Sequence, residues 1–192
     1  MQMIAFIMLC AFWFLFMGRT VMLMLKGVRV FVLAKGKSLP ERILEIILMP
    51  ALVLWSLQIA FTVFGAPLLP APLFWDMPII GIIGVAQCGA GLLIFVCALI
   101  SFGSSWRVGI DEEHSDRLVT GGIFAISRNP IFLFMDLYFA GTFLIFPNWF
   151  FLAFFILSAA GIHKQILNEE KFLRAKFGGA YDEYTRKTRR YL

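Results

Sequence analysis

Charged side chains are scarce in this sequence, and their scarcity excludes an ordinary soluble domain. Of the 192 residues, 15% are charged, whereas 60% are hydrophobic and 22 are phenylalanines. A soluble domain of this length could not bury so much apolar surface, and a mean hydropathy of +0.85 is typical of a polytopic membrane protein. The length suits one domain, so we expect residues 1–192 to form a single polytopic unit.

Cysteine and histidine are also few. Cys10, Cys88 and Cys97 all lie in apolar runs, without the spacing of metal ligands. His114 and His163 have no partner at metal-binding spacing either. We therefore expect no metal site, and we interpret the cysteines as small buried hydrophobic residues.

Five apolar runs divide the chain and predict an all-α integral membrane protein with about five transmembrane helices. They cover about residues 3–25, 43–64, 79–102, 131–146 and 148–162. The first run lacks the basic start and the cleavage site of a signal peptide, so we interpret it as a retained span. The last two are each shorter than the ~20 residues that a spanning helix needs. Only Pro147 and Asn148 separate them, which predicts a tight hairpin, followed from residue 163 by a charged, helix-compatible cytoplasmic segment.

The basic residues predict the orientation in the membrane. Residues 19–42 hold six of the 17 Lys and Arg residues, residues 103–128 hold three, and residues 163–192 hold eight. The connections at 65–78 and 147–148 hold none. By the positive-inside rule we expect the N-terminus outside and the C-terminus in the cytoplasm of a bacterial or archaeal cell membrane. The net charge of +5 then indicates contact with membrane lipids and not with nucleic acid, since no basic motif is interleaved with aromatic residues.

Arg128, Asn129 and Pro130 stand directly before the fourth apolar run. Asn at the N-cap and Pro at the first helical position are typical of a helix start. That reading does not explain Arg128, because its charge is unfavourable beside the positive end of a helix dipole unless an anion is present. Together the three residues would suit a carboxylate or a phosphate.

A second polar cluster lies in the C-terminal segment. Glu169 and Glu170 are adjacent, and their carboxylates would suit the amino group and the ribose hydroxyls of a nucleoside ligand. A solvated charged helix face is the alternative. Gly178 indicates the end of a helix, and Tyr181 and Tyr184 beyond it could stack on a ligand or simply pack.

The two clusters resemble the isoprenylcysteine carboxyl methyltransferase and phospholipid methyltransferase superfamily. Its pattern is Arg-His-Pro-x-Tyr-x-Gly, followed by Glu-Glu-x-x-Leu, Phe-Gly and Tyr-x-x-Tyr. The similar stretches here are GGIFAISRNPIF and, about 40 residues later, EEKFLRAKFGGAYDEY. The resemblance covers about residues 103–192, including Ser105 and Trp106. It divides the chain into a three-helix scaffold at 1–102 and a cofactor-binding and catalytic region at 103–192.

Membership would imply a small integral membrane enzyme that uses S-adenosylmethionine as its cofactor. The residues that the resemblance would assign to the cofactor are Arg128, Asn129, Pro130, Glu169, Glu170, Tyr181 and Tyr184. Asn129 stands in place of the family's His, Phe132 in place of its Tyr, and Phe134 in place of its Gly. The last two departures concern the acceptor pocket more than the cofactor site.

The acceptor implied is apolar or membrane-embedded, and the reaction most like this one is isoprenylcysteine carboxyl O-methylation. A phospholipid amine and a small thiol are alternatives within the same class. From other classes, a sterol-type reductase that uses NADPH and a non-catalytic membrane subunit also remain open. The reductase is disfavoured because the chain is short.

Asp136 lies six residues into the fourth apolar run, and intramembrane acids usually face a cavity or a partner. At 100° per residue, Phe132 and Asp136 share a helix face and Phe134 points away. We therefore expect Phe132 and Asp136 to border the acceptor cavity, and Phe134 to pack against a neighbouring helix or lipid. Arg128, Asp136 and Glu170 are the predicted catalytic residues.

Overall fold

The computed structural model describes residues 1–28, 30, 39–103 and 118–192, apart from the side chains of residues 39–45. Seven helical elements follow one another along these residues. They are α1 (Gln2–Leu25), α2 (Leu39–Val63), α3 (Pro78–Phe102), the short 3₁₀ helix η2 (Gly122–Ala125), α4 (Pro130–Ile145), α5 (Trp149–Phe177) and α6 (Gly179–Lys187). The described residues form no β-strand, and only one isolated bridge joins Ser127 to Arg189. The predicted all-α class is confirmed for this part of the chain.

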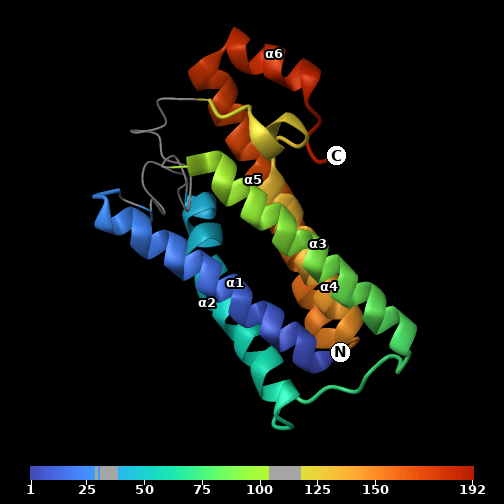
Figure 1. The fold of residues 1–192 in the computed structure, drawn as a ribbon. Coiled ribbons are helices and arrows are strands. Elements are labelled where there is room, and N and C mark those ends of the chain that lie inside the picture. Colours follow the sequence, from blue (N-terminus) through green and yellow to red (C-terminus); the bar gives the residue numbers. More distant parts are fainter. Residues whose placement is uncertain (29, 31–38, 104–117) are drawn as a thin grey trace.

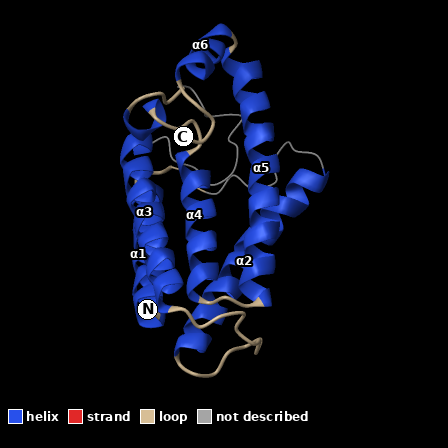
Figure 2. Cartoon of the chain, turned by 90° about the vertical axis from the view of Figure 1, so that its right-hand side faces the viewer, coloured by secondary structure: helices blue, strands red, loops and turns tan. Residues whose placement is uncertain are grey.

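The helices form a bundle with a distinct polar end. α3 packs most extensively on α4, α1 contacts α2 and α3, and α4 contacts α5. Figure 1 shows the N-terminus and the loop between α2 and α3 at one end of the bundle, and α6 with the C-terminus at the other. Figure 2 shows α6 lying beyond the end of the bundle, where α5 extends past the other helices. We call the end that carries α6 the polar end.

Among the described residues, four helices are long and apolar enough to cross a membrane: α1, the part of α2 from Ile46 to Val63, α3 and α5. α4 is also apolar but has only 16 residues. The last apolar run, about 148–162, was expected to be a short span followed by a separate helix-compatible segment, but one helix covers both. α5 continues to Phe177 and reaches 29 residues, because residues 163–177 contain no Gly or Pro and are rich in good helix formers.

The predicted hairpin between the last two apolar runs is present. α4 ends at Ile145 and α5 begins at Trp149, so that only a short turn connects them. The side chain of Asn148 accepts a hydrogen bond from the backbone N–H of Phe151 at 3.2 Å. This N-cap satisfies one of the free donors at the start of α5 and fixes the turn.

Two glycines allow α3 and α4 to pack closely. A Cβ atom on Gly84 of α3 would lie 2.6 Å from the carbonyl oxygen of Gly141 in α4. A Cβ atom on Gly141 would lie 2.7 Å from the sulfur of Cys88. Cys88 is buried at this contact, as expected, whereas Cys10 and Cys97 are exposed on the bundle surface, where burial was expected. Small residues at such contacts are typical of helices that associate within a membrane.

Candidate active site

Residues 188–191 lie beside the segment that leads into α4. The backbone N–H of Arg128 donates to the carbonyl of Arg189 at 3.0 Å. The side-chain amide of Asn129 donates to the carbonyl of Arg190 at 3.1 Å. Asn129 is at the N-cap of α4 with Pro130 after it, as the sequence predicts, but the described contacts include no bond from its side chain to the helix. Its amide joins α4 to residues 188–191, which we call the strap.

The charge of Arg128 is compensated within the chain. Its Nη2 lies 2.7 Å from Oε1 of Glu170, and both side chains are largely buried, at 11% and 13% exposure. Its Nη1 donates to the carbonyl oxygens of Thr188, at 2.8 Å, and Thr185, at 3.3 Å. Thr185 lies in the last turn of α6, where carbonyl groups carry the negative end of the helix dipole. The anion that the sequence required beside α4 is therefore supplied by Glu170 and the end of α6.

Glu170 is shared by two arginines. Arg190 donates from Nε to Oε1 at 3.1 Å and from Nη2 to Oε2 at 2.8 Å. Hydrogen bonds to Glu170 raise the pKa of Arg190 above its ordinary value, so the pair is charged throughout the usual pH range. Arg190 was not among the site residues predicted from the sequence. Its only signal was membership of a run of basic residues, which is more often a solvated surface.

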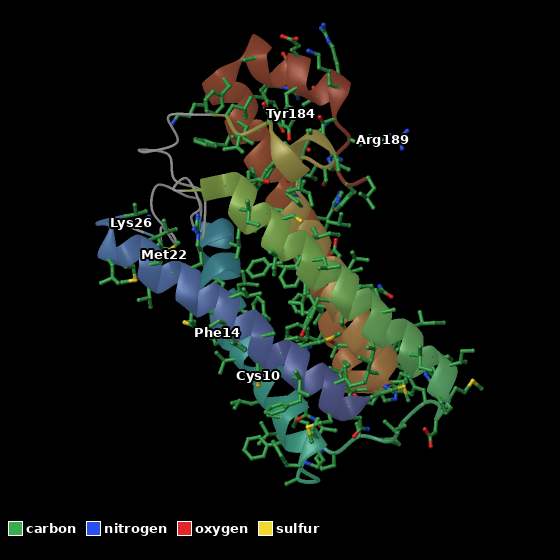
Figure 3. The ribbon with its side chains drawn as sticks, viewed as in Figure 1. Cys10, Phe14, Met22, Lys26, Tyr184 and Arg189 are labelled. Atoms are coloured by element: carbon green, nitrogen blue, oxygen red, sulfur yellow. The ribbon has the colours of Figure 1, made fainter. Side chains whose placement is uncertain are left out.

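Tyr181 and Tyr184 attach α6 to the polar end. Both side chains are buried, and their ring centroids lie 6.1 Å apart in an edge-to-face arrangement. The hydroxyl of Tyr184 donates to the carbonyl of Phe124 at 2.6 Å, so α6 is fixed to η2 (Figure 3 labels Tyr184). Burial, followed by the nearby charge of Glu170, raises the pKa of Tyr181 to about 12. Of the two roles left open by the sequence, packing is the one that these contacts favour.

An apolar cavity of about 460 Å³ lies between α1, α2, α3, α4 and α5. Its lining is mostly aromatic and aliphatic. The polar lining residues are Arg128, Asn129, Ser158, Gln165 and Glu169, and the rings of Trp55 and Tyr138 add an N–H and a hydroxyl. Arg128, Asn129 and Glu169 lie at the polar end, so the ion-paired cluster and the cavity meet there. The two adjacent acids therefore have different contacts. Glu169 lines the cavity, whereas Glu170 binds Arg128 and Arg190.

Of the two residues predicted to border the acceptor cavity, one lines it and the other does not. Phe132 and Phe134 line it, whereas Asp136, which was also expected there, does not. The lining positions of α4 centre on a face near Met135, and Phe132 stands at its edge. Asp136 is rotated by a further 40° about the helix axis relative to Phe132, so its side chain lies outside that face.

Asp136 lies instead towards a different pair of side chains. It interacts electrostatically with His163 of α5 and Tyr191 of the strap. The ring nitrogen Nδ1 of His163 and the hydroxyl of Tyr191 are 3.1 Å apart. Phe134 is 3% exposed and stacks on Phe95 of α3 with a centroid distance of 4.7 Å, but it also lines the cavity, from which it was expected to point away.

Fold and site together define a helical membrane protein in which a charged cluster adjoins an apolar cavity. The chain belongs to the phospholipid methyltransferase family, whose family model matches residues 79–180. The predicted superfamily resemblance is thus confirmed, and the match is wider than expected towards the N-terminus because it includes nearly all of α3. Ser105 and Trp106, which were part of the resemblance, lie outside the described residues. No curated protein and no solved structure matches the chain.

Membership of this family assigns the chain to a class of membrane methyltransferases. The matched region ends at residue 180, so that Tyr181, Tyr184 and the strap lie beyond it. Among the described residues, Arg190 contacts the matched region through Glu170 and Asn129.

Proposed function

We propose that this protein is an S-adenosylmethionine-dependent methyltransferase that acts on an apolar or membrane-embedded acceptor. The observation that supports this most directly is the meeting of the charged cluster with the apolar cavity. A polar cofactor and an apolar acceptor must be brought together for methyl transfer, and this meeting point provides groups for both. The apolar helices and the family membership agree with a site inside a membrane.

The residues at the polar end fit the chemistry of the cofactor. Glu169 lines the cavity, and a carboxylate there suits an amino group or ribose hydroxyls. The Nε of Arg128 is buried and has no hydrogen-bond partner among the described residues, so it is a candidate donor for a carboxylate. Asn129 could donate or accept beside it. When bound, S-adenosylmethionine would supply a methyl group carried on a sulfonium.

In this proposal Glu170 has a different task from Glu169. Both of its oxygens are held by Arg128 and Arg190, so it fixes the position of Arg128 at the edge of the cavity. The aromatic lining would exclude water and orient the acceptor, and such alignment and desolvation contribute up to several kcal/mol to methyl transfer. A carboxylate or thiolate acceptor needs no general base.

Among acceptors, the sequence motifs favour an isoprenylcysteine carboxylate, whereas the family's name favours a phospholipid amine.

We also propose that the polar end is cytoplasmic, with the N-terminus outside. The described residues support this orientation because Lys26 and Arg189 lie towards that end (Figure 3). Arg19 donates there to the carbonyl of Gly103, just after α3, and Arg128 is paired there with Glu170. A cytoplasmic cofactor would then reach the site directly.

Binding to detergent-purified protein tests the proposed function. We expect S-adenosylhomocysteine to bind and NADPH not to bind, as measured by isothermal titration calorimetry. Glu169→Gln should weaken S-adenosylhomocysteine binding about ten- to a hundredfold, because one charge-assisted contact is lost. Glu183→Gln, which changes an exposed acid of α6, is the matched control and should bind normally. Binding of NADPH, or of neither compound, would contradict the proposal.

A further inference from the structure

On each of the five helices α1 to α5, the lining residue farthest from the polar end carries an aromatic ring. α1, α3 and α5 run towards the polar end and α2 and α4 run away from it, so the lining residue farthest from that end can be identified on each helix. These residues are Phe12, Trp55, Phe95, Phe139 and Phe154, with Tyr138 beside Phe139. No residue of α4 beyond Phe139 lines the cavity, although the helix continues to Ile145.

The six rings contact one another and form a continuous layer, which we call the aromatic floor. Trp55 is at its centre, with centroid distances of 5.1 Å to Phe139, 5.7 Å to Tyr138 and 5.9 Å to Phe154. Phe139 and Phe154 are 5.0 Å apart. Phe12 extends the layer, since its ring lies 6.2 Å from Tyr138 and 5.6 Å from Phe95. These separations are those of favourable aromatic pairs.

We propose that the aromatic floor sets the maximum length of a single apolar chain that the methyl acceptor places in the cavity, with Trp55 as the main determinant. The inference rests on the proposed function and names the acceptor as a single-chain molecule. The charged lining residues, Arg128 and Glu169, lie at the polar end, so the reacting group of the acceptor stays near Glu169 and its chain points to Trp55. A volume of about 460 Å³ is in the lower part of the range for small-molecule pockets, which suits one chain better than two.

The selectivity expected from such a floor is a length limit. An acceptor that enters from the bilayer exchanges one apolar surrounding for another, so each added methylene within the cavity gains little. A chain that is too long meets a floor whose rings are fully packed, Trp55 at 1% and Phe139 at 3% exposure. Such a packed layer yields only at a cost, so affinity should fall sharply beyond one length.

Two positions on one face of α2 can move this limit in opposite directions. Trp55→Ala would remove the centre of the floor and deepen the cavity. Ala51 also lines the cavity, one helical turn closer to the polar end, so Ala51→Phe would raise the floor. Leu54 is 44% exposed and does not line the cavity, which makes Leu54→Phe the matched control for Ala51→Phe. Trp149→Ala, at the far end of the bundle, is the control for Trp55→Ala.

The test measures binding of single-chain probes to the purified protein in lipid nanodiscs. Tritiated N-acetyl-S-dodecylcysteine is bound and then displaced by the octyl, dodecyl, hexadecyl and eicosyl analogues, with empty nanodiscs subtracted. In the wild type, we expect affinity to fall at least about tenfold above one chain length. Trp55→Ala should move that limit to a longer chain and Ala51→Phe to a shorter one, while both controls keep the wild-type limit.

Two results would overturn the inference. One is an absence of displaceable probe binding by the wild type. The other is a length limit that is the same in the wild type, Ala51→Phe and Leu54→Phe. This comparison tests the role of the floor even if Trp55→Ala fails to fold. The probes are measured without cofactor, and S-adenosylhomocysteine binding is measured separately on the same wild-type sample. Loss of the length limit and loss of the proposed function are therefore distinguishable.

Discussion

Arg190 contacts both carboxylate oxygens of Glu170, with Nε 3.1 Å from one and Nη2 2.8 Å from the other. This two-point contact joins residues that are 20 positions apart and ties the strap to α5. Because Glu170 also binds Arg128, the strap helps to fix an arginine at the edge of the cavity. The strap therefore belongs to the site, although it lies beyond the region matched by the family model.

Replacing Arg190 should weaken both folding and cofactor binding. Arg190→Gln removes one of two partners from a carboxylate that is 13% exposed, and we expect a loss of about 1–2 kcal/mol in unfolding free energy, since Arg190 itself is 38% exposed. S-Adenosylhomocysteine affinity should also fall, because Arg128 is then held less firmly. Arg189, which points away from the protein in Figure 3, provides the control. Arg189→Gln should change neither quantity, as measured by thermal unfolding and calorimetry; equal effects of both variants would contradict a specific role for Arg190.

The contact between α3 and α4 should be sensitive to a single methyl group. Gly141→Ala would place a Cβ 2.7 Å from both the carbonyl oxygen of Gly84 and the sulfur of Cys88, and should destabilise the protein by about 1–3 kcal/mol. A Cβ on Gly18 of α1 would meet nothing within 4 Å. Gly18→Ala should therefore be neutral or stabilising, by up to roughly 1 kcal/mol. The two variants can be compared by thermal unfolding in the same detergent, and equal melting temperatures would refute the close helix contact.

Alkaline pH should weaken the attachment of α6. Burial raises the pKa of Tyr181 from 10.0 to about 12. Between these two values the unfolded chain releases the proton and the folded chain retains it, so stability falls as the pH rises through this window. The Tyr181 hydroxyl has no hydrogen-bond partner among the described residues. Tyr181→Phe should thus cost little at pH 7 and reduce the loss above pH 10, and an unchanged alkaline profile would count against this origin.

Asp136 provides a test of where methyl transfer takes place. Its side chain lies off the cavity face, towards His163 and Tyr191. We expect Asp136→Asn to keep transfer of label from S-adenosylmethionine into the organic-extractable fraction of native membranes, and Phe132→Ala to reduce it. If Asp136→Asn abolished transfer while S-adenosylhomocysteine still bound, the acid would have the catalytic role that its position in the sequence suggests.

The orientation can be tested with single cysteines at Ala71 and Lys187, which lie at opposite ends of the bundle. Cys10 and Cys97 are exposed and must first be replaced, whereas Cys88 is 1% exposed and can remain. In oriented vesicles the two new cysteines should be labelled by an impermeant maleimide from opposite sides. Labelling of both from the same side would show that the bundle does not span the membrane as proposed.

The sequence predicted helices well because their signal is local, but it predicted side-chain partners less well. The start of α4 at Asn129 and Pro130 was predicted from residue preferences at helix starts, although the Asn129 side chain binds the strap and does not cap the helix. The length of α5 was underestimated because its hydrophobic pattern ends near residue 162 while its backbone propensity continues to Phe177. The partnership of Arg190 with Glu170 depends on how α6 turns back over the bundle, which no local pattern encodes. Asp136 was misplaced by a rotation of only 40° about the axis of α4.

α5 carries Phe154 in the floor and Glu169 at the polar end, roughly 22 Å apart along one uninterrupted helix. Substitutions at the two levels are far enough apart for their energetic effects to add independently. In evolutionary terms, a descendant of this chain could change the molecules it modifies by exchanging ring residues deep in the membrane, without altering the residues near Glu169. The substitutions that change acceptor specificity would then be exchanges of one hydrophobic residue for another within membrane-spanning helices.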